Sequence, residues 1–536
     1  MISFLFFILI CFWAIHILER AFYCIYFWQL KEYRFDRIKG DPIRSLRIFF
    51  PRIAFLMGVI LLFLLLPPDS NNPGIWNNFV ISVFCILGIY SGIKLFMGRW
   101  KFPKFTKKAL VLIFLSLATL GIFAFVFAGQ FAVFIVVAEI AIPFGTFLIV
   151  QILQMPTCFW KEANYRNAEA KIGKLKKLTV VAISGSYGKS STKEFLYTIL
   201  SKKFKVLKTS GNINTEIGVA QTILKNLDES HNVFIVEMGA YRKGEIKLMC
   251  QMVKPKIGIV TGVNEQHLAL FGSMENLLSA EGGGELSDAL KDGGTLVVNG
   301  DNKYCLELLK KNNVPSSQEK IYLINKGPVN ADIWSEDLVV HKNSISFIAR
   351  DKQGEMAHFD VKVLGGQNTQ NLLGAILVAK QLGMNFGEIS EACKNIKQEQ
   401  TGMILKQGKH GIDIVDSSYS ANPDGVLADL DYLSIFPKKK VIVMPCLIEL
   451  GKKSSEIHKK IGKKIAEVCN LAIITTKDRF KELKKGAMEG GMNESDILLC
   501  DKPQDIYSMV TLFCKQGDAV LLEGRVPKEL INLLIK

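Results

Sequence analysis

The stretch Ser184–Phe195, "SGSYGKSSTKEF", follows the apolar run "LTVVAI" and predicts a strand, a glycine turn and a helix in direct succession. Glycines let the backbone curl, so that N–H groups of the turn and of the helix N-terminus face one point. The spacing G-x-x-G-K-S-S, from Gly185 to Ser191, is shorter than that of the general phosphate loop, which would need glycine at Ile183. The sequence therefore predicts a nucleotide-phosphate site here.

Four side chains carry the chemistry of this predicted site. Lys189 is expected to neutralise a phosphate, and the Ser190 hydroxyl to bind Mg²⁺. Glu237 ends the next β-branched run, "VFIVEMGA", where a second Mg²⁺ ligand belongs. His267 follows the run "IGIVTGV". Because the carboxyl ends of parallel strands meet at one edge of a sheet, we expect His267 to reach the same crevice.

The N-terminal part is apolar, and the mean hydropathy of the whole chain is +0.23. Its apolar runs are long enough to cross a hydrocarbon core of about 30 Å. We predict five transmembrane helices, at Phe4–Trp28, Ile48–Leu66, Phe79–Met97, Ala109–Gly129 and Phe131–Met155. Basic residues concentrate in the loops Lys31–Arg47 and Gly98–Lys108, which places those loops in the cytoplasm. The expectation is a multi-pass protein of the cytoplasmic (inner) membrane, with its N-terminus outside and everything after Met155 cytoplasmic.

Ionisable residues inside these apolar runs raise a functional question by default. They are His16, Glu19 and Arg20 in the first run and Glu139 in the fifth. We favour interhelical pairing over a transport role, because so few polar residues would line a path. The net charge of +16 comes without a basic stripe interleaved with aromatic residues, so nucleic acid is not an expected partner. A lipid bilayer is the expected one.

The chain after the apolar part changes to alternating strand-like and helix-like runs, which is typical of α/β domains. The predicted fold is an α-helical membrane domain at 1–156, a basic linker helix lying under the membrane at 157–177, and two α/β domains. The first, at 178–402, has a central parallel sheet of the phosphate-loop type, with a small antiparallel insert from Ile321 to about Gly366. The second, at 403–536, is smaller and Rossmann-like.

Seven motifs in order carry a family resemblance. They are "SGSYGKSSTKEF", "TSGNINTEIGVAQTIL", "IVEMGAYRKGEI", "KPKIGIVTGVNEQHLALFGSMENL", "GGQNTQNLLGAILVA", "DSSYSANPDGV" and "IELGKKSSEIHKKIG". Over about residues 175 to 536 the chain resembles the Mur ligases, most closely the MurF type that adds D-alanyl-D-alanine. The resemblance implies an ATP-dependent amide ligase of peptidoglycan synthesis that uses Mg²⁺. In such ligases the substrate carboxylate attacks the γ-phosphate, and an amine then displaces phosphate from the acyl phosphate.

The resemblance also implies roles for individual residues. Lys189, Glu237 and His267 would be catalytic, with Ser190 and Glu237 on one Mg²⁺ and His267 on a second. The nucleotide would be held by Gly185, Ser186, Tyr187, Gly188, Lys189, Ser190, Ser191, Asn299, Asn368, Asn371 and Asp416. The cell-wall precursor and dipeptide substrates would contact Asn212, Asn214, Glu216, Tyr419 and Asn422.

The chain departs from the family pattern at several positions. The lysine that the family carbamylates to bridge its metals has no counterpart in "SMENLLSAEGGGELSDAL", and we hypothesise that Glu281 or Glu285 supplies the negative charge. Gln367 replaces a histidine, Pro445–Cys446 replaces Gly-Asp, and Glu523 replaces the lysine of the last strand. The arginine of the family's G-R-M motif is missing from "QTGMIL". These changes concern the carboxylate and amine substrates more than ATP.

The predicted membrane spans stand where MurF enzymes have a soluble domain that binds uridine diphosphate. The leading expectation is a membrane-anchored MurF-like ligase. Alternatives are a Mur-type ligase adding an amino acid or peptide to another, possibly lipid-linked, substrate, a membrane ATPase, and a non-catalytic scaffold. The "DSSYSANP" domain disfavours the ATPase, and the presence of Lys189, Glu237 and His267 disfavours the scaffold.

Overall fold

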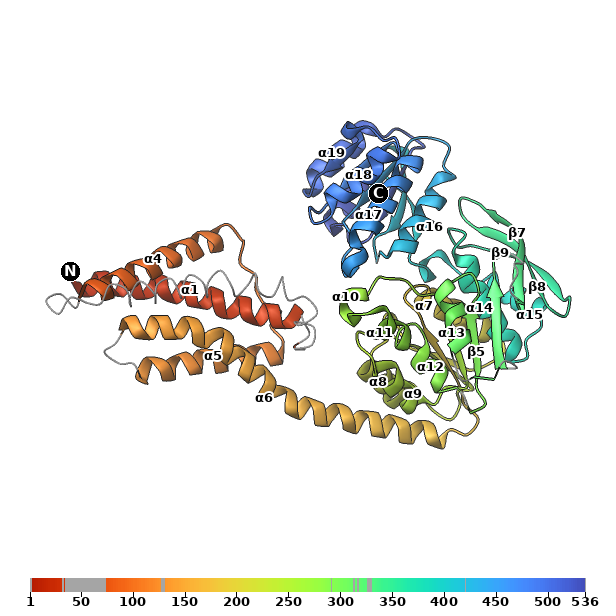
Figure 1. Cartoon of the computed structure of the whole chain (residues 1–536), viewed down its shortest axis with the longest axis horizontal. Helices are drawn as coiled ribbons and strands as arrows, with labels where there is room; N and C mark the ends of the chain where they lie inside the picture. The colour runs from red at the N-terminus through yellow and green to blue at the C-terminus, as the bar shows by residue number, and fades with distance from the viewer. Residues whose placement is uncertain are drawn as a thin grey trace. The chain divides into compact units, whose positions relative to one another are not determined.

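The computed structural model describes residues 2–30, 33, 74–126, 131–290, 292–311, 314–315, 318–324, 330–419 and 421–535 (Figure 1). The chain divides into two compact units, Met1–Glu162 and Ala163–Lys536. The first is helical. The second contains two sheets, one of nine strands and one of six.

The described elements of the helical unit are α1 (Ile2–Leu30), α4 (Gly74–Phe96), α5 (Lys107–Val126) and α6 (Phe131–Lys174). Three stretches of the described helices are long and apolar enough to cross a membrane: Ile10–Leu30, Lys107–Val126 and Val137–Lys174. The predicted third span is a helix, of which Cys85–Phe96 forms a shorter apolar part. The predicted second span, Ile48–Leu66, lies outside the described residues.

A buried chain of polar side chains connects α1, α4 and α6. Its members are His16, Glu19, Arg20, Ser91, Lys94 and Glu139. Glu139 lies 2.8 Å from His16 Nε2 and 3.2 Å from Arg20 Nε. Ser91 is 3.1 Å from His16 Nδ1 and donates to Glu19, which also pairs with Lys94. The ionisable residues of the apolar runs are therefore paired between helices, as the sequence favoured.

Helix α6 continues through the segment predicted to be a separate linker helix under the membrane. It runs unbroken from Phe131 to Lys174, with Pro143 and Pro156 inside it. Its composition changes from apolar to charged at Trp160–Lys161 while the helix persists. Ala168 and Ile172, near its end, are buried in the core of the following α/β domain. This segment thus packs as part of that domain.

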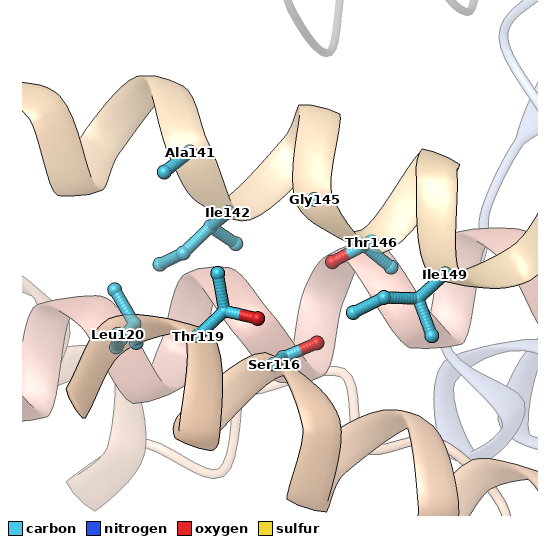
Figure 2. A pocket seen from close by; sticks show the side chains of 8 residues that line it. All are labelled: Ser116, Thr119, Leu120, Ala141, Ile142, Gly145, Thr146 and Ile149. Carbon is cyan, nitrogen blue, oxygen red and sulfur yellow. The ribbon is translucent and has the colours of Figure 1, made fainter. Parts of the chain in front are cut away.

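A small notch between α5 and α6 is lined by hydroxyl-bearing and apolar side chains (Figure 2). The lining residues are Ser116, Thr119, Leu120, Ala141, Ile142, Gly145, Thr146 and Ile149. Its lining has no ionisable side chain, so it is not a site for phosphate chemistry.

The nine-stranded sheet places the phosphate loop at its centre. Its order is β2 (Val206–Lys208), β3 (Val233–Glu237), β1 (Thr179–Ser184), β4 (Ile257–Val260), β5 (Thr295–Asn299), β6 (Glu319–Leu323), β7 (Ile333–Val340), β8 (Ile345–Asp351) and β9 (Met356–Val361). Strands β1 to β7 pair in parallel, and β8 and β9 pair antiparallel. The predicted antiparallel insert is therefore an extension of the same sheet.

Helices cover both faces of this sheet because the β-strands carry apolar side chains on both sides. On one face lie α7 (Lys189–Leu200), α14 (Asn368–Gln381) and α15 (Phe386–Cys393). On the other lie α8 (Glu216–Asn226), α9 (Glu245–Val253), α10 (Leu268–Phe271), α11 (Met274–Ser279), α12 (Gly284–Asp288) and α13 (Lys303–Lys311). The carboxyl ends of β1, β3 and β4 consequently meet at one edge.

The six-stranded sheet forms the core of the C-terminal domain. Its order is β10 (Ile404–Gln407), β11 (Asp413–Ser417), β15 (Ala519–Glu523), β12 (Lys440–Met444), β13 (Leu471–Ile474) and β14 (Ile497–Leu499). Only β10 pairs antiparallel among these described strands. One face is covered by α16 (Pro423–Ser434), α17 (Ser454–Val468) and α18 (Phe480–Glu489), and the other by α19 (Pro503–Phe513) and α20 (Lys528–Leu534).

Breaking the buried polar chain should destabilise the helical unit. Replacing Glu139 by leucine leaves Arg20 buried without its carboxylate, which typically costs about 3 to 5 kcal/mol. We expect Glu139→Leu to lower the melting temperature of the full chain in detergent, and Arg20→Met in the same chain to restore part of the loss. Phe144→Leu, at an exposed position of α6, is the control. If Glu139→Leu has the same melting temperature as this control, the pairing of Glu139 with Arg20 does not stabilise the helical unit.

Candidate active site

The phosphate loop is built from two glycines in conformations that other residues rarely adopt. Gly185 has φ 134° and Gly188 has φ 77°. A Cβ at Gly185 would clash with Thr261 Oγ1, and one at Gly188 with Asn371 Oδ1. The loop therefore turns directly from β1 into α7 and leaves the helix N-terminus, with its free N–H groups, at the edge of the sheet.

A buried carboxylate joins the loop lysine to the predicted histidine. Glu281 is 1% exposed, and its Oε1 lies 3.4 Å from Lys189 Nζ while its Oε2 lies 3.0 Å from His267 Nδ1. Ser186 Oγ donates to the same carboxylate over 3.5 Å. Burial alone would raise the pKa of Glu281, but the charges of Lys189 and His267 hold that pKa below its ordinary value. Glu281 is therefore an anion at neutral pH.

A second charged group lies on the other side of the loop lysine. Ser190 Oγ donates to Glu237 Oε1 over 3.1 Å, and Asn214 Nδ2 donates to the same oxygen over 3.2 Å. Lys193, fully buried on α7, lies 3.0 Å from Glu237 Oε2. Sequence analysis missed Lys193, although it follows Lys189 by four residues and so lies on the same face of the helix.

Glu285, the other carboxylate that we hypothesised to replace the carbamylated lysine, contacts a helix N-terminus. Its Oε1 accepts from the Gly244 N–H over 2.6 Å and its Oε2 from the Lys247 N–H over 2.8 Å. These groups belong to the N-terminal turn of α9, whose free N–H groups favour a carboxylate. Of the two hypothesised carboxylates, only Glu281 thus contacts Lys189 and His267.

The remaining predicted nucleotide-binding residues are divided between the two domains. Asn371 accepts from Thr192 Oγ1 over 3.4 Å and donates to Asn368 over 3.1 Å, so these two asparagines lie beside the phosphate loop. Asn299 donates to the Thr261 carbonyl over 2.9 Å, which supports the segment under Gly185. Tyr187, Ser191 and Asp416 complete the predicted set.

Tyr187 and Ser191 continue the loop and the first turn of α7, and the Tyr187 hydroxyl accepts from Asn302 over 3.2 Å. Asp416 ends up in the C-terminal domain, 2.7 Å from Lys406 Nζ. Burial alone would raise the pKa of Asp416, but hydrogen bonds from Lys406 and Ser418 hold that pKa below its ordinary value. The Asp416 carboxylate is therefore charged and fixed in direction.

Contacts between the two α/β domains bring the predicted substrate residues together. Asn264, which follows β4, donates to Asn422 Oδ1 and to Asp424 Oδ2, each over 2.9 Å. The Asn212 side chain hydrogen-bonds to the Tyr419 hydroxyl. Loops from both domains are therefore joined by hydrogen bonds at this place.

Glu216 is the first residue of α8, where its negative charge suits the helix N-terminus. Asn422 is the N-cap of α16, and its side chain accepts from the Gly425 N–H over 3.1 Å. Both predicted substrate residues therefore also stabilise helix ends.

Two departures from the family pattern meet at the domain boundary. Gln367 Nε2 donates to Asp429 Oδ1 over 3.0 Å, and Asp429 also accepts from Ser417. Glu523, 1% exposed, lies against Asp429. Burial and the neighbouring carboxylate raise the pKa of Glu523 well above its ordinary value, and burial raises that of Asp429. Glu523 is therefore placed to hold the proton in a hydrogen bond between the two carboxyl groups.

The residues around the loop fit a magnesium nucleotide. No group of three or more His, Cys, Asp or Glu side chains in the described ranges is placed to hold a metal alone. Mg²⁺ commonly takes one or two carboxylates and completes its shell with water and substrate phosphate oxygens. Glu237 with Ser190 on one side and Glu281 with His267 on the other match that requirement.

A phosphate loop with paired carboxylates, closed over by a second α/β domain, defines a nucleotide-dependent ligase. Residues 183–379 match the family model of the Mur ligase middle domain, and residues 403–526 match that of the Mur ligase glutamate ligase domain. The two matches together span more than half of the chain, and the chain belongs to the Mur ligase family.

Its relatives include UDP-N-acetylmuramoyl-tripeptide–D-alanyl-D-alanine ligases. The Bacillus subtilis enzyme is 28% identical over 362 residues, which cover 67% of this chain and 76% of that enzyme. The Escherichia coli enzyme is 28% identical over 283 residues, which cover 53% of this chain and 61% of that enzyme, less than two thirds of its length. The solved MurF ligase of Thermotoga maritima in complex with ADP is 25% identical with a TM-score of 0.60, covering 70% of this chain and 83% of that one. The chain is a MurF-type ATP-dependent peptide ligase.

Substitution of Glu285 should affect stability more than turnover, unlike substitution of Glu281. Glu285→Gln removes the charge from two hydrogen bonds to the α9 N-terminus, so we expect the free energy of unfolding to fall by about 1 to 2 kcal/mol. ATP-dependent turnover at a temperature well below melting should stay within about threefold of the native protein. Thermal melts and turnover assays measure the two effects. Turnover lost with unchanged melting would show that Glu285 acts in the reaction.

Proposed function

We propose that the protein is a membrane-anchored ligase that joins the carboxylate of a muramoyl-tripeptide cell-wall precursor to D-alanyl-D-alanine, with ATP and Mg²⁺. The buried Glu281 carboxylate between Lys189 and His267, beside a phosphate loop, is the observation that carries this proposal. Family membership and the relatives' names support the choice of substrates. The anchoring rests on the apolar helices and on the basic loops of the N-terminal part.

In the first step an oxygen of the precursor carboxylate attacks the γ-phosphorus of ATP, and ADP leaves. Two negative groups must approach each other, so cations have to screen them. Lys189 lies at the loop where the phosphates would bind, and Lys193 fixes Glu237 with its Oε1 toward Ser190. Mg²⁺ held by Ser190 and Glu237, and by His267 and Glu281, would neutralise charge on the phosphoryl oxygens.

In the second step the amine of the dipeptide attacks the acyl phosphate carbon. The C–N bond forms, the amine nitrogen loses a proton, and phosphate departs with the former carboxylate oxygen. Loops from both domains have to hold the two substrates in reacting distance. Asn264, which joins β4 to the α16 N-terminus through Asn422, supports such a closed arrangement.

A two-substrate assay tests the proposal. Full-length protein in detergent, given ATP, Mg²⁺, the tripeptide precursor and D-alanyl-D-alanine, should release phosphate and form the pentapeptide only when both substrates are present. Lys189→Ala should abolish turnover, because it removes the loop cation, and Lys202→Ala, on the exposed surface, should not. Phosphate release without an amine would favour the membrane ATPase, and no release under any condition would favour the scaffold.

Glu281 offers a sharper test of the site. Glu281→Gln keeps the shape but leaves Lys189 and His267 facing a neutral group, so we expect turnover to fall about 100-fold. The Mg²⁺ concentration for half-maximal turnover should also rise. Glu281→Lys, which tests whether a carbamylated lysine can take the place of this carboxylate, should regain part of its activity when bicarbonate is added, whereas the native protein should not respond. Native-like turnover in Glu281→Gln would contradict the assigned role.

A further inference from the structure

Helix α6 joins the apolar helices to the catalytic unit without an intervening loop. Its exposed Phe159 and Trp160 precede Lys161, an aromatic-to-basic transition typical of a membrane–water interface. Ala168 and Ile172 are buried in the core of the middle domain. Lys171 Nζ donates to the Leu224 carbonyl over 3.0 Å, so this end of the helix is fixed to α8 and its loop.

The continuous helix α6 fixes the length of chain between the predicted interface and the start of the middle domain. Eight residues separate Trp160 from Ala168, and α-helix rises 1.5 Å per residue, which gives about 12 Å. Whatever the orientation of the two units, the middle domain begins within this length of helix from the predicted interface. A catalytic unit that is covalently joined to membrane-spanning helices would meet membrane-borne molecules at a raised effective concentration.

Three large apolar side chains, Ile213, Tyr419 and Ile448, are exposed near predicted site residues, and we call them the rim. Ile213 is 37% exposed and stands between the substrate-loop residues Asn212 and Asn214. Tyr419 is 56% exposed and hydrogen-bonds to Asn212. Ile448 is 57% exposed beside Glu449, whose carbonyl accepts from the Ala269 N–H two residues after His267. Exposed apolar groups near the site suit an apolar ligand or surface.

The described elements that precede β1 are all helices. Within residues 2–30, 74–126 and 131–178 every described element is a helix, and the N-terminal ones are apolar. The diphosphate, sugar and peptide of the precursor are the same on a soluble nucleotide carrier and on a lipid carrier. Only the carrier differs, and an apolar carrier suits the apolar helices and the exposed apolar rim residues of this chain.

We propose that the precursor reaches this site on a membrane-embedded lipid carrier through its diphosphate, and not on a soluble nucleoside diphosphate. The inference rests on the proposed ligation and names the substrate class of the same site. The reaction must then follow the class of reaction that transfers the sugar phosphate from a nucleotide to the lipid, and it must precede any step that uses the completed peptide on the outer side.

A competition between carriers tests this inference. Full-length protein in liposomes is given ATP, Mg²⁺, D-alanyl-D-alanine and one of two tripeptide precursors, polyprenyl-diphosphate-linked in the bilayer or uridine-diphosphate-linked in solution, and the product peptide is quantified by mass spectrometry. We expect at least about tenfold faster ligation of the lipid-linked form at equal bulk concentration. Equal or faster use of the nucleotide-linked form would overturn the inference while leaving the ligase function intact. If neither form is ligated, the proposed function fails.

A substitution in the rim distinguishes recognition of the lipid carrier from the effect of membrane anchoring alone. Ile448→Ser should slow ligation of the lipid-linked precursor about threefold or more and leave the nucleotide-linked rate unchanged. Leu512→Ser, at an 87% exposed position of α19, is the matched control and should change neither rate. An Ile448→Ser protein that slows both precursors equally, or neither, would overturn recognition of the carrier by the rim.

Discussion

The Glu281 carboxylate, buried between Lys189 and His267, is the interaction on which the site depends. It connects the phosphate loop after β1, the segment after β4 and the turn between α11 and α12. A carboxylate with 1% exposure is stable only when cations and hydrogen-bond donors surround it. Removing it would leave two basic groups facing each other at the point where a triphosphate has to bind. The chain thus carries a buried carboxylate beside Lys189 and His267, and we hypothesise that it replaces the modified lysine of the family.

The same principle organises the surroundings of this carboxylate. Glu237 is held by Lys193 on one oxygen and by Ser190 and Asn214 on the other, so its direction is fixed before a substrate arrives. Preorganised charges of this kind need little rearrangement during phosphoryl transfer. The C-terminal domain is joined through Asn264, which hydrogen-bonds to the N-cap residue of α16. Positioning, more than covalent chemistry by the protein, therefore explains how the fold serves the reaction.

The strand and loop patterns predicted the centre of the site, because β1, its glycines and the ends of β3 and β4 are local features. Four facts needed the three-dimensional structure. Glu281 and Glu285 are separated by three glycines, and only the path of that turn shows which one contacts Lys189. The alternating strand-like pattern of the sequence predicted antiparallel strands, but it did not show that β7 to β9 extend the central sheet. A change of composition at Lys161 suggested an element boundary that α6 does not have. The contact of Lys193 with Glu237 became visible only from the position of Lys193 on α7.

The most direct test of carboxylate activation by ATP follows the transfer of an oxygen atom from the precursor to phosphate. Precursor labelled with ¹⁸O in the reacting carboxylate is incubated with the full chain, ATP, Mg²⁺ and D-alanyl-D-alanine, and the released phosphate is analysed by mass spectrometry. Activation as an acyl phosphate predicts that one ¹⁸O atom moves into phosphate for each amide bond formed. Because a carboxylate has two equivalent oxygens, both are labelled. Phosphate released without label, at the same rate with or without precursor, would contradict the account.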